Sequence, residues 1–296
     1  MRLMTVTTWN DALYKEYAYK FESTYNWSWP YIVLNEDDGM YDEIPDLKEF
    51  VERNKYRPSN NFLQDAVRFS YKVYCYCHAI QKYKDYDFIM GVDADSVFYH
   101  SMPEDVVLNN LYKENCMLTY LGRGDLYSEC GFLGFNMRHP EIQNYAKEMI
   151  RMYNSDDIYK LAECHDSFIW DHVRKKFEFE KGVKNNNIGD HDKSHVQARS
   201  ILGKYYDHTK GPKRKKQGFS NENQMVVEEG GKMKAYLSHI RLENKTKKDG
   251  MHISVPGVVE FIENIVKRSK FHTIVTGTYA SKKLELTETL KSIEIN

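Results

Sequence analysis

The sequence predicts an α/β fold with a mostly parallel central sheet and helices on both faces. Two observations support this prediction. Short apolar or β-prone runs alternate along the chain with longer segments in which apolar residues recur at helical intervals, an alternation typical of a parallel sheet covered by helices. The 296 residues, 41% of them hydrophobic and including 23 Tyr, 14 Phe and 4 Trp, supply material for a sizeable core.

Strands are expected where the β-prone or apolar runs are short: 2–8, 31–34, 88–92, 116–120 and 235–240, with a short apolar segment at 131–136. Helices are expected where apolar residues recur with helical spacing: 13–25, 47–54, 62–83, 140–153, 166–177, 196–206 and 258–269. Loops are expected at 39–45, at the polar stretch 184–194 and at the basic stretch 207–223.

Composition excludes several protein classes. With a mean hydropathy of -0.69 and no apolar run of about 18 residues, the chain is not expected to span a membrane. Residues 1–10 resemble a strand rather than a secretory signal. The five Cys are odd in number and irregularly spaced, so we expect no disulfide framework. A reducing, cytoplasmic location follows as an expectation.

Charge is balanced overall but unevenly distributed. The net charge of -1 argues against a protein that simply coats nucleic acid. Residues 36–52 hold eight acidic side chains and one Lys, whereas residues 190–250 hold fourteen Lys or Arg and eight Asp or Glu. The basic C-terminal region suggests a phosphate-bearing ligand or partner, although a solvated surface would explain any single Lys.

The segment 88–98 carries the clearest chemical signal. An apolar strand at 88–92 leads directly into Asp93-Ala94-Asp95. Ligands of open α/β sheets bind just beyond the carboxyl ends of the strands. Two carboxylates placed there suit Mg²⁺ or Mn²⁺, which prefer oxygen ligands and commonly bridge a carboxylate to substrate phosphates. A loop that merely contains two Asp is the simpler alternative.

Residues 88–98 resemble the Asp-x-Asp segment of GT-A-fold glycosyltransferases, whose sheet is Rossmann-like. The resemblance extends over roughly residues 2–239 and implies that Asp93 and Asp95 hold Mn²⁺ or Mg²⁺ on the donor diphosphate, with Asp93 also near the donor ribose. The segment 131–136, with Gly134, resembles the part of that family that lines the donor sugar and acceptor. His165-Asp166-Ser167 resembles its acidic motif near the reaction centre, although Asp166 could equally be a helix N-cap.

Asp207-His208-Thr209-Lys210-Gly211 is similar to the start of the late His-x-x-Gly-x-x-Lys motif of the glycogenin and bacterial galactosyltransferase type. The resemblance implies that His208 completes the metal shell and that a cation contacts the diphosphate. The motif's Lys position holds Arg214, flanked by Lys213 and Lys215, so the choice of cation stays open among these residues and Lys210. His239, followed by Lys245, Lys247 and Lys248, is the competing metal ligand.

Further residues complete the expected site. Asp166 or Glu129 would activate the acceptor or position the sugar, and Arg68 and Lys72 share a helix face that could reach the nucleotide. His165, Thr7 and Trp9 are additional substrate-binding candidates. The expected organisation is a catalytic domain at 1–240 and a helical or irregular extension at 241–296 packed on the same domain.

The expected function is metal-dependent transfer of a sugar from a nucleoside diphosphate sugar, expected to be a UDP-sugar, to a hydroxyl acceptor. The similarity to the His-x-x-Gly type implies a hexosyl- or pentosyltransferase that retains the anomeric configuration. The compact, Tyr-, Asn- and Lys-rich chain also resembles glycosyltransferases encoded by tailed phages, which would place it in the host cytoplasm and make hydroxymethylcytosine in double-stranded DNA an acceptor. A glycan or protein acceptor, a nucleotidyltransferase and a non-catalytic carbohydrate-binding module remain the alternatives.

Overall fold

The computed structural model describes residues 1–57, 61–189, 195–217, 220, 227–229 and 232–234. By internal contacts the chain divides into two compact units, Met1–Gly218 and Phe219–Asn296. The first unit contains the sheet and the helices discussed below. The predicted strand at 235–240, the predicted helix at 258–269 and the predicted extension at 241–296 lie outside the described residues.

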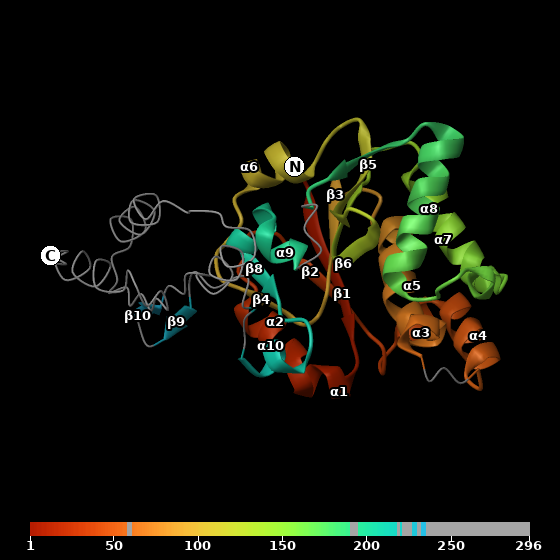
Figure 1. Cartoon of the computed structure of the whole chain (residues 1–296), viewed down its shortest axis with the longest axis horizontal. Coiled ribbons are helices and arrows are strands. Elements are labelled where there is room, and N and C mark those ends of the chain that lie inside the picture. The colour runs from red at the N-terminus through yellow and green to blue at the C-terminus, as the bar shows by residue number, and fades with distance from the viewer. Residues whose placement is uncertain (58–60, 190–194, 218–219, 221–226, 230–231, 235–296) are drawn as a thin grey trace, which may run out of the picture. The chain divides into compact units, whose positions relative to one another are not determined.

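Six strands form the central sheet, in the order β2-β1-β3-β6-β5-β7 (Figure 1). They are β1 (Leu3–Trp9), β2 (Tyr31–Asn35), β3 (Phe88–Val92), β5 (Cys116–Arg123), β6 (Leu126–Asn136) and β7 (Lys184–Asn187). β1 pairs in parallel with β2 and β3, and β5 with β7. β6 is antiparallel to both of its neighbours. The sheet is therefore mostly parallel, as predicted.

A short antiparallel pair lies outside this sheet and brings distant segments together. β4 (Ser96–Phe98) pairs with β8 (Tyr206–His208), with Ser96 opposite His208. The rings of Phe98 and Tyr206 stack in this pair, with their centroids 5.4 Å apart. In the second unit, β9 (Val227–Glu229) and β10 (Lys232–Lys234) form another antiparallel pair.

Helices connect most of the strands. The α-helices are α1 (Asp11–Leu13), α2 (Tyr19–Thr24), α3 (Met40–Glu43), α4 (Pro45–Asn54), α5 (Ala66–Lys82), α6 (Glu104–Val106), α7 (Ile142–Asn154), α8 (Asp166–Lys181), α9 (Val196–Arg199) and α10 (Pro212–Gln217). Shorter π or 3₁₀ turns are η1 (Tyr14–Ala18), η2 (Phe62–Gln64), η3 (Val107–Leu111), η4 (Asp157–Lys160) and η5 (Ile201–Lys204). α8 ends at Gly182, whose φ of 64° is the left-handed conformation that suits glycine after a helix.

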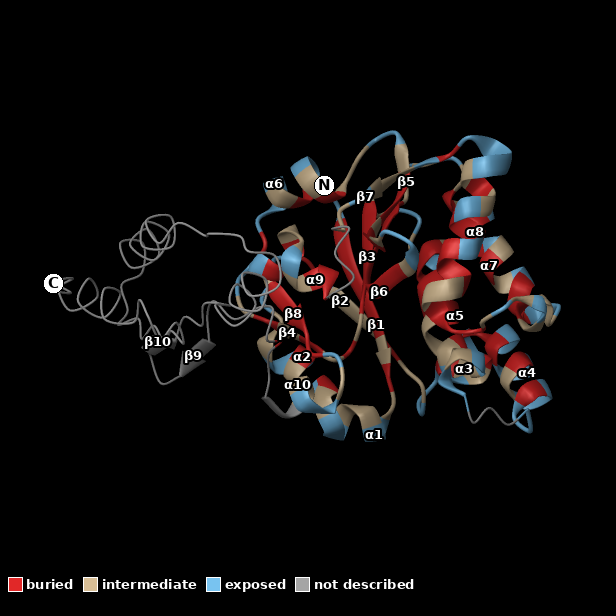
Figure 2. Cartoon of the chain, in the orientation of Figure 1, coloured by how far each residue is buried: buried red, intermediate tan, exposed pale blue. Residues whose placement is uncertain are grey.

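Two apolar clusters cover the two faces of the sheet (Figure 2). On one face, Met4 of β1 and Phe135 of β6 pack with residues of α4, α5, α7 and α8, including Trp170. On the other, Leu3 and Phe88 pack with residues of η1, α2, η3 and α9. Neighbouring strand residues thus point to opposite faces, and the predicted helices on both faces are confirmed.

Several sequence predictions of individual elements are wrong. The expected loop at 39–45 contains α3, and the expected helix at 62–83 is interrupted at Asp65, whose side chain accepts from the N–H of Arg68 and caps α5. The polar stretch at 184–194 begins with β7. The expected helix at 196–206 and loop at 207–223 instead contain α9, η5, β8 and α10.

Candidate active site

Asp93 and Asp95 occupy the loop that follows the buried strand β3. The N–H of Asp93 donates to the carbonyl of Gly131 on β6, and the N–H of Ser96 donates to the carbonyl of Asp93. The first hydrogen bond fixes the loop against the carboxyl end of β3, and the second closes a turn within the loop. This placement agrees with the sequence-based expectation that both carboxylates face the edge where α/β proteins bind ligands.

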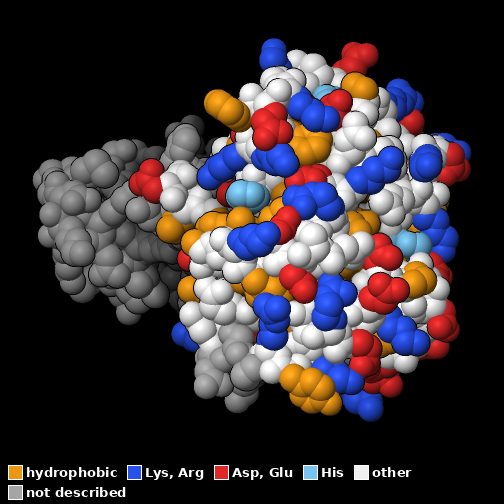
Figure 3. Space-filling model, turned by 90° about the vertical axis from the view of Figure 1, so that its right-hand side faces the viewer, with side chains coloured by type: hydrophobic (Ala, Val, Ile, Leu, Met, Phe, Trp, Pro, Cys, Tyr) orange, Lys and Arg blue, Asp and Glu red, His pale blue; other side chains and the backbone are white. Residues whose placement is uncertain are grey.

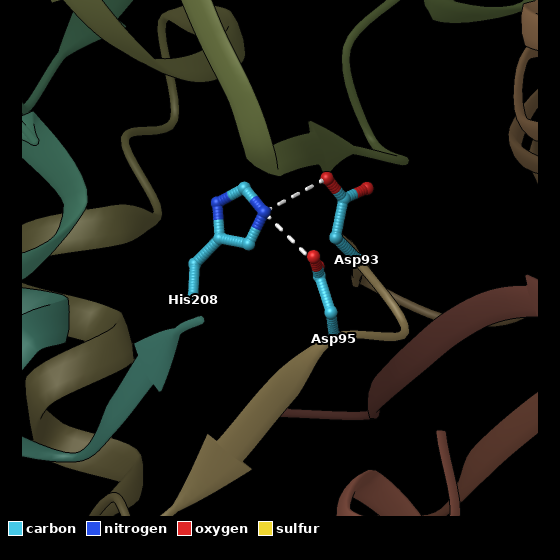
Figure 4. A group of neighbouring side chains, drawn as sticks. All are labelled: Asp93, Asp95 and His208. Carbon is cyan, nitrogen blue, oxygen red and sulfur yellow. Dashed lines mark ion pairs between the residues drawn. The ribbon is translucent and has the colours of Figure 1, made fainter. Parts of the chain in front are cut away.

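His208 reaches the two carboxylates because β8 pairs with β4. The backbone N–H and the hydroxyl of Thr209 both donate to the carbonyl of Asp95, at 2.9 and 2.7 Å, and lock the two segments together. His208 Nε2 lies 3.0 Å from Asp95 Oδ1 and 3.4 Å from Asp93 Oδ2 (Figure 4). Two segments more than a hundred residues apart in sequence therefore share one site.

The three side chains form a set that could hold a metal ion. One ligand atom from each of Asp93, Asp95 and His208 lies within 4.8 Å of the others. Two carboxylate oxygens and one imidazole nitrogen suit a divalent ion such as Mn²⁺, while Mg²⁺ prefers oxygen alone. These ligand atoms thus fit the divalent ion that the sequence predicts at this site.

Two lysines from segments far apart in the sequence adjoin the carboxylates. Lys72 of α5 is largely buried, and its Nζ lies 2.5 Å from Asp93 Oδ1 and 2.8 Å from Asp166 Oδ2. Lys215 of α10 lies 3.3 Å from Asp95 Oδ2, and its Nζ lies 3.6 Å from the centre of the Tyr17 ring. Each metal-site carboxylate is thereby paired with its own cation.

Ion pairing favours the charged forms of Lys72 and Asp95 despite their burial. Burial opposes the charge of Lys72, but Asp166 and Asp93 raise its pKa well above the ordinary value. Burial likewise opposes the charge of Asp95, but His208 and Lys215 hold the pKa of that carboxyl below its usual range. Asp93 differs, because burial raises its pKa although Lys72 and His208 act in the opposite direction.

His208 is protonated when only protein groups surround it. Burial disfavours the imidazolium, but Asp95, Glu129 and Asp93 outweigh that penalty and raise the pKa of His208 to about 10. Ligation by Nε2 requires the neutral imidazole, so a bound metal ion would replace that proton.

Asp166 is the first residue of α8, and His165 takes the capping position. One Asp166 oxygen accepts from the N–H of Ser167 and the other from Lys72, which holds the side chain toward Asp93. Burial raises the pKa of Asp166, but Lys72 outweighs burial and lowers it overall. His165 is buried against Tyr127, with the ring centroids 4.4 Å apart, and its Nε2 contacts Glu163.

Glu129 of β6 lies behind His208 and is only 2% exposed. Its Oε1 lies 3.0 Å from His208 Nδ1 and 3.2 Å from His195 Nδ1. The two histidines outweigh the effect of burial and hold the pKa of Glu129 well below its usual range. The residue is therefore an ionised carboxylate that contacts the far side of the histidine.

The remaining predicted residues lie at varying distances from this cluster. Thr7 and Trp9 are buried within β1, where Trp9 packs on Tyr14 and Phe21. Gly134 lies in the middle of β6, paired with Met90, where a Cβ would meet the Phe88 ring at 2.4 Å.

Among the basic candidates, Lys72 and Lys215 are the two that reach the carboxylates. Arg68 is exposed one turn before Lys72 on α5. Lys210 and Lys213 are exposed, Arg214 is half-buried, and Gly211, with φ of 85°, makes the turn into α10. His239, the competing metal ligand, lies outside the described residues.

The sequence did not predict a role for three residues of the site. Tyr17 lies in a turn with ordinary helical spacing, and His195 is an isolated histidine before a short helix. Gly131 is part of the expected apolar segment at 131–136, but its role appears only with His208 in place, because a Cβ there would lie 2.3 Å from His208 Nδ1.

Comparisons with known proteins give distant similarities only. No protein-family model and no curated protein matches the sequence. Three of the similar solved structures are a glycosyltransferase involved in the glycosylation of the major capsid of PBCV-1, the bifunctional glycosyltransferase WbbM, and the glycosyltransferase GlyE of Streptococcus pneumoniae TIGR4. Their sequence identities to this chain are 11%, 11% and 15%, and their TM-scores are 0.42, 0.41 and 0.35.

The matched regions cover 73%, 71% and 62% of this chain. They cover 100%, 46% and 44% of the respective relatives, so the chain spans less than half the length of WbbM and GlyE. All three TM-scores are below 0.5, so these similarities do not establish the function.

Proposed function

We propose that this protein is a metal-dependent glycosyltransferase that transfers a sugar from a nucleoside diphosphate sugar to a hydroxyl acceptor. The observation that carries the proposal is the convergence of Asp93, Asp95 and His208 at the carboxyl end of β3. A divalent ion bound there would neutralise charge on the donor diphosphate. The resemblance of residues 88–98 and 207–215 to GT-A motifs supports the same function.

Lys215 is the cation that best fits the diphosphate role. Within the stretch 210–215 it is the side chain that contacts Asp95, and it is partly exposed, with its ammonium over the ring of Tyr17. As the bond to the sugar breaks, negative charge grows on the leaving diphosphate. An ammonium held beside the diphosphate stabilises that charge more in the transition state than in the bound donor.

Lys72 and Asp166 would position the donor sugar. The ammonium of Lys72 fixes Asp166 beside Asp93, within reach of groups bound at the same edge of the sheet. The lowered pKa of Asp166 makes it a weak proton acceptor and suits it to accept hydrogen bonds from sugar hydroxyls. This role agrees with a retaining reaction, which does not require a dedicated base, and it favours Asp166 over the buried Glu129 for substrate contact.

A panel of nucleotide sugars tests the donor and the reaction class. UDP-sugars, followed by GDP-sugars, are incubated with Mn²⁺ or Mg²⁺, and release of the nucleoside diphosphate is measured. Metal-dependent release from one donor supports the proposal, whereas consumption of nucleoside triphosphate would instead indicate a nucleotidyltransferase. NMR of the anomeric proton in the transfer product then reports the configuration, and an inverted product would reject the retaining mechanism.

For the acceptor we propose a hydroxyl of hydroxymethylcytosine in DNA, with glycans and proteins as the competing acceptors. The exposed cations Lys210 and Lys213 would contact phosphates beside the donor site. On the face drawn in Figure 3, in contrast, basic and acidic side chains are mixed, so contact with DNA there would be weak. Transfer to modified DNA that falls steeply with added salt supports this acceptor, whereas salt-insensitive transfer to a glycan or protein excludes it.

A cytoplasmic location remains part of the proposal. All five cysteines are free thiols, which is the state expected in a reducing compartment. Among the described residues, none of the helices has the length and apolarity needed to cross a bilayer.

A further inference from the structure

The side of His208 that faces away from Asp93 and Asp95 contacts a buried carboxylate. Glu129 Oε1 lies 3.0 Å from His208 Nδ1, while His208 Nε2 is directed at the two aspartates. A carboxylate at Nδ1 accepts the proton of that nitrogen, which leaves Nε2 as the ligating atom when the ring is neutral. In the neutral ring, Nδ1 therefore carries the proton that Glu129 accepts, and Nε2 is the atom that faces the two aspartates.

Glu129 is itself held from the other side by His195. His195 Nδ1 lies 3.2 Å from Glu129 Oε1 and 3.4 Å from Oε2. His195 Nε2 lies 2.9 Å from the carbonyl oxygen of His208, to which it can only donate. The side chains of Glu129 and His195 are 2% and 1% exposed. His195 Nε2 also lies 3.5 Å from the buried Asp207 Oδ1, so the histidine ligand and its partners form a buried chain of contacts.

Gly131 makes this approach possible. A Cβ at that position would lie 2.3 Å from His208 Nδ1, closer than any real side chain tolerates. The strand that presents Glu129 must therefore lack a side chain two residues later. The segment before Glu129 is also fixed, because the N–H and hydroxyl of Ser128 both donate to the buried Asp171 of α8.

We propose that Glu129 and His195 are positioning residues that orient His208 for metal binding. Metal-binding histidines usually donate their second ring N–H to a carboxylate or a carbonyl, and loss of such a partner commonly weakens metal affinity about 10- to 100-fold. The proposal rests on the proposed metal role of Asp93, Asp95 and His208. It replaces the expected catalytic role of Glu129, because the carboxylate contacts the two histidines and is almost completely buried.

The experiment measures Mn²⁺ binding to the full-length protein from the loss of the free-Mn²⁺ EPR signal, with no nucleotide present. Glu129→Gln keeps the shape of the side chain and removes its charge. We expect its dissociation constant for Mn²⁺ to rise about tenfold or more. His195→Gln, which leaves Glu129 in place, should raise it by a smaller factor of several-fold. Should Glu129→Gln not fold, His195→Gln carries the test.

Glu148→Gln is the matched control, because Glu148 is another largely buried, charge-paired carboxylate, lies on α7 and does not contact His208 or the segment that carries Glu129. It should lower the melting temperature and leave the Mn²⁺ dissociation constant within about twofold. A double variant separates orientation from general damage. If Glu129 acts through His208, Glu129→Gln should cost less than about twofold in a His208→Ala background.

Three outcomes would overturn the inference. The first is wild-type Mn²⁺ affinity in folded Glu129→Gln and His195→Gln. The second is an equal loss from Glu129→Gln with and without His208. In both cases, Mn²⁺ binding that is lost in Asp95→Asn would still support the proposed metal site. The third is no Mn²⁺ binding by the wild type, which would overturn the metal site and the inference together.

Discussion

Two glycines of β6 have different tasks, although both are crowded. Gly131 lies under His208, whereas Gly134 lies under Phe88 within the sheet. Gly131→Ala should therefore displace the His208 ring and weaken Mn²⁺ binding by roughly tenfold, comparable to loss of a partner of the ligand. Binding of Mn²⁺ and thermal melting are measured in parallel.

Gly134→Ala provides the comparison for Gly131→Ala. Overpacking at Gly134 should lower stability by about 1–3 kcal/mol without changing the affinity for Mn²⁺, because the crowded neighbour is Phe88 and not a metal ligand. Equal effects of the two substitutions on Mn²⁺ affinity would show that Gly131 has no special relation to His208.

Lys215 and Lys213 are separated by one residue but differ in surroundings. Lys215 contacts Asp95 and Tyr17, whereas Lys213 is exposed. Lys215→Ala should lower kcat/KM for donor hydrolysis by roughly 10- to 100-fold, because a charge beside the leaving diphosphate is lost. Lys213→Ala should stay within about twofold. A larger loss in Lys213→Ala than in Lys215→Ala would show that Lys215 is not the residue that contacts the diphosphate.

At the scale of elements, α7 and α8 are joined by an ion pair that should make stability depend on pH. The largely buried side chain of Glu148 on α7 contacts Arg151 of the same helix and Lys176 of α8. Arg151 contributes most to lowering its pKa from 4.5 to about 2. A lowered pKa in the folded state means that this stabilisation is complete above pH 4.5 and is lost as the pH falls toward 2.

Glu148→Gln should consequently lower the melting temperature at pH 7 by several degrees and by clearly less at pH 3. Glu52→Gln is the control, since Glu52 pairs with Lys55 at the surface and should contribute little at either pH. Differential scanning calorimetry at the two pH values measures both. A decrease for Glu148→Gln that is as large at pH 3 as at pH 7 would contradict the assignment to this ion pair.

The sequence predicts elements well where their own residues determine them. The strand at 88–92 has the predicted bounds, because all five residues are buried and the apolar run has the length of a buried strand. The two aspartates that follow it, and the histidine at 208, are likewise recognisable from local motifs. Their convergence was an expectation from the resemblance, and the geometry agrees with it.

Elements that depend on distant partners escaped prediction. β7 is polar, and its side chains replace apolar packing with hydrogen bonds to other segments: Asn185 accepts from Leu118, and Asn187 accepts from Gly122. β8 is only three residues long and exists because β4 pairs with it. For the same reason the contacts of Glu129 and His195 could not be predicted, since they require β6, β8 and α9 to be placed together.

At the scale of the whole molecule, both apolar clusters and all described site residues belong to the unit Met1–Gly218. The boundary near residue 240 that the sequence predicts lies outside the described residues and stays a prediction. We predict that a chain ending at Gly218 folds cooperatively and binds Mn²⁺ like the full chain, because Tyr206 is the last member of either cluster among the residues that the structure describes. Circular dichroism melts and Mn²⁺ titration check this, and a chain without a cooperative melt would contradict it.

The central claim is that Asp93, Asp95 and His208 hold a divalent ion that the donor diphosphate requires. It is tested most directly by Mn²⁺ titration of donor hydrolysis in the wild type and in Asp95→Asn, with thermal melts as a folding control. The account predicts a rate lowered by roughly two decades or more in folded Asp95→Asn, since one ionised ligand is lost. Asp93→Asn should behave alike, His208→Ala should lose somewhat less, and His239→Ala should be mild. Wild-type activity in folded Asp95→Asn would contradict the claim.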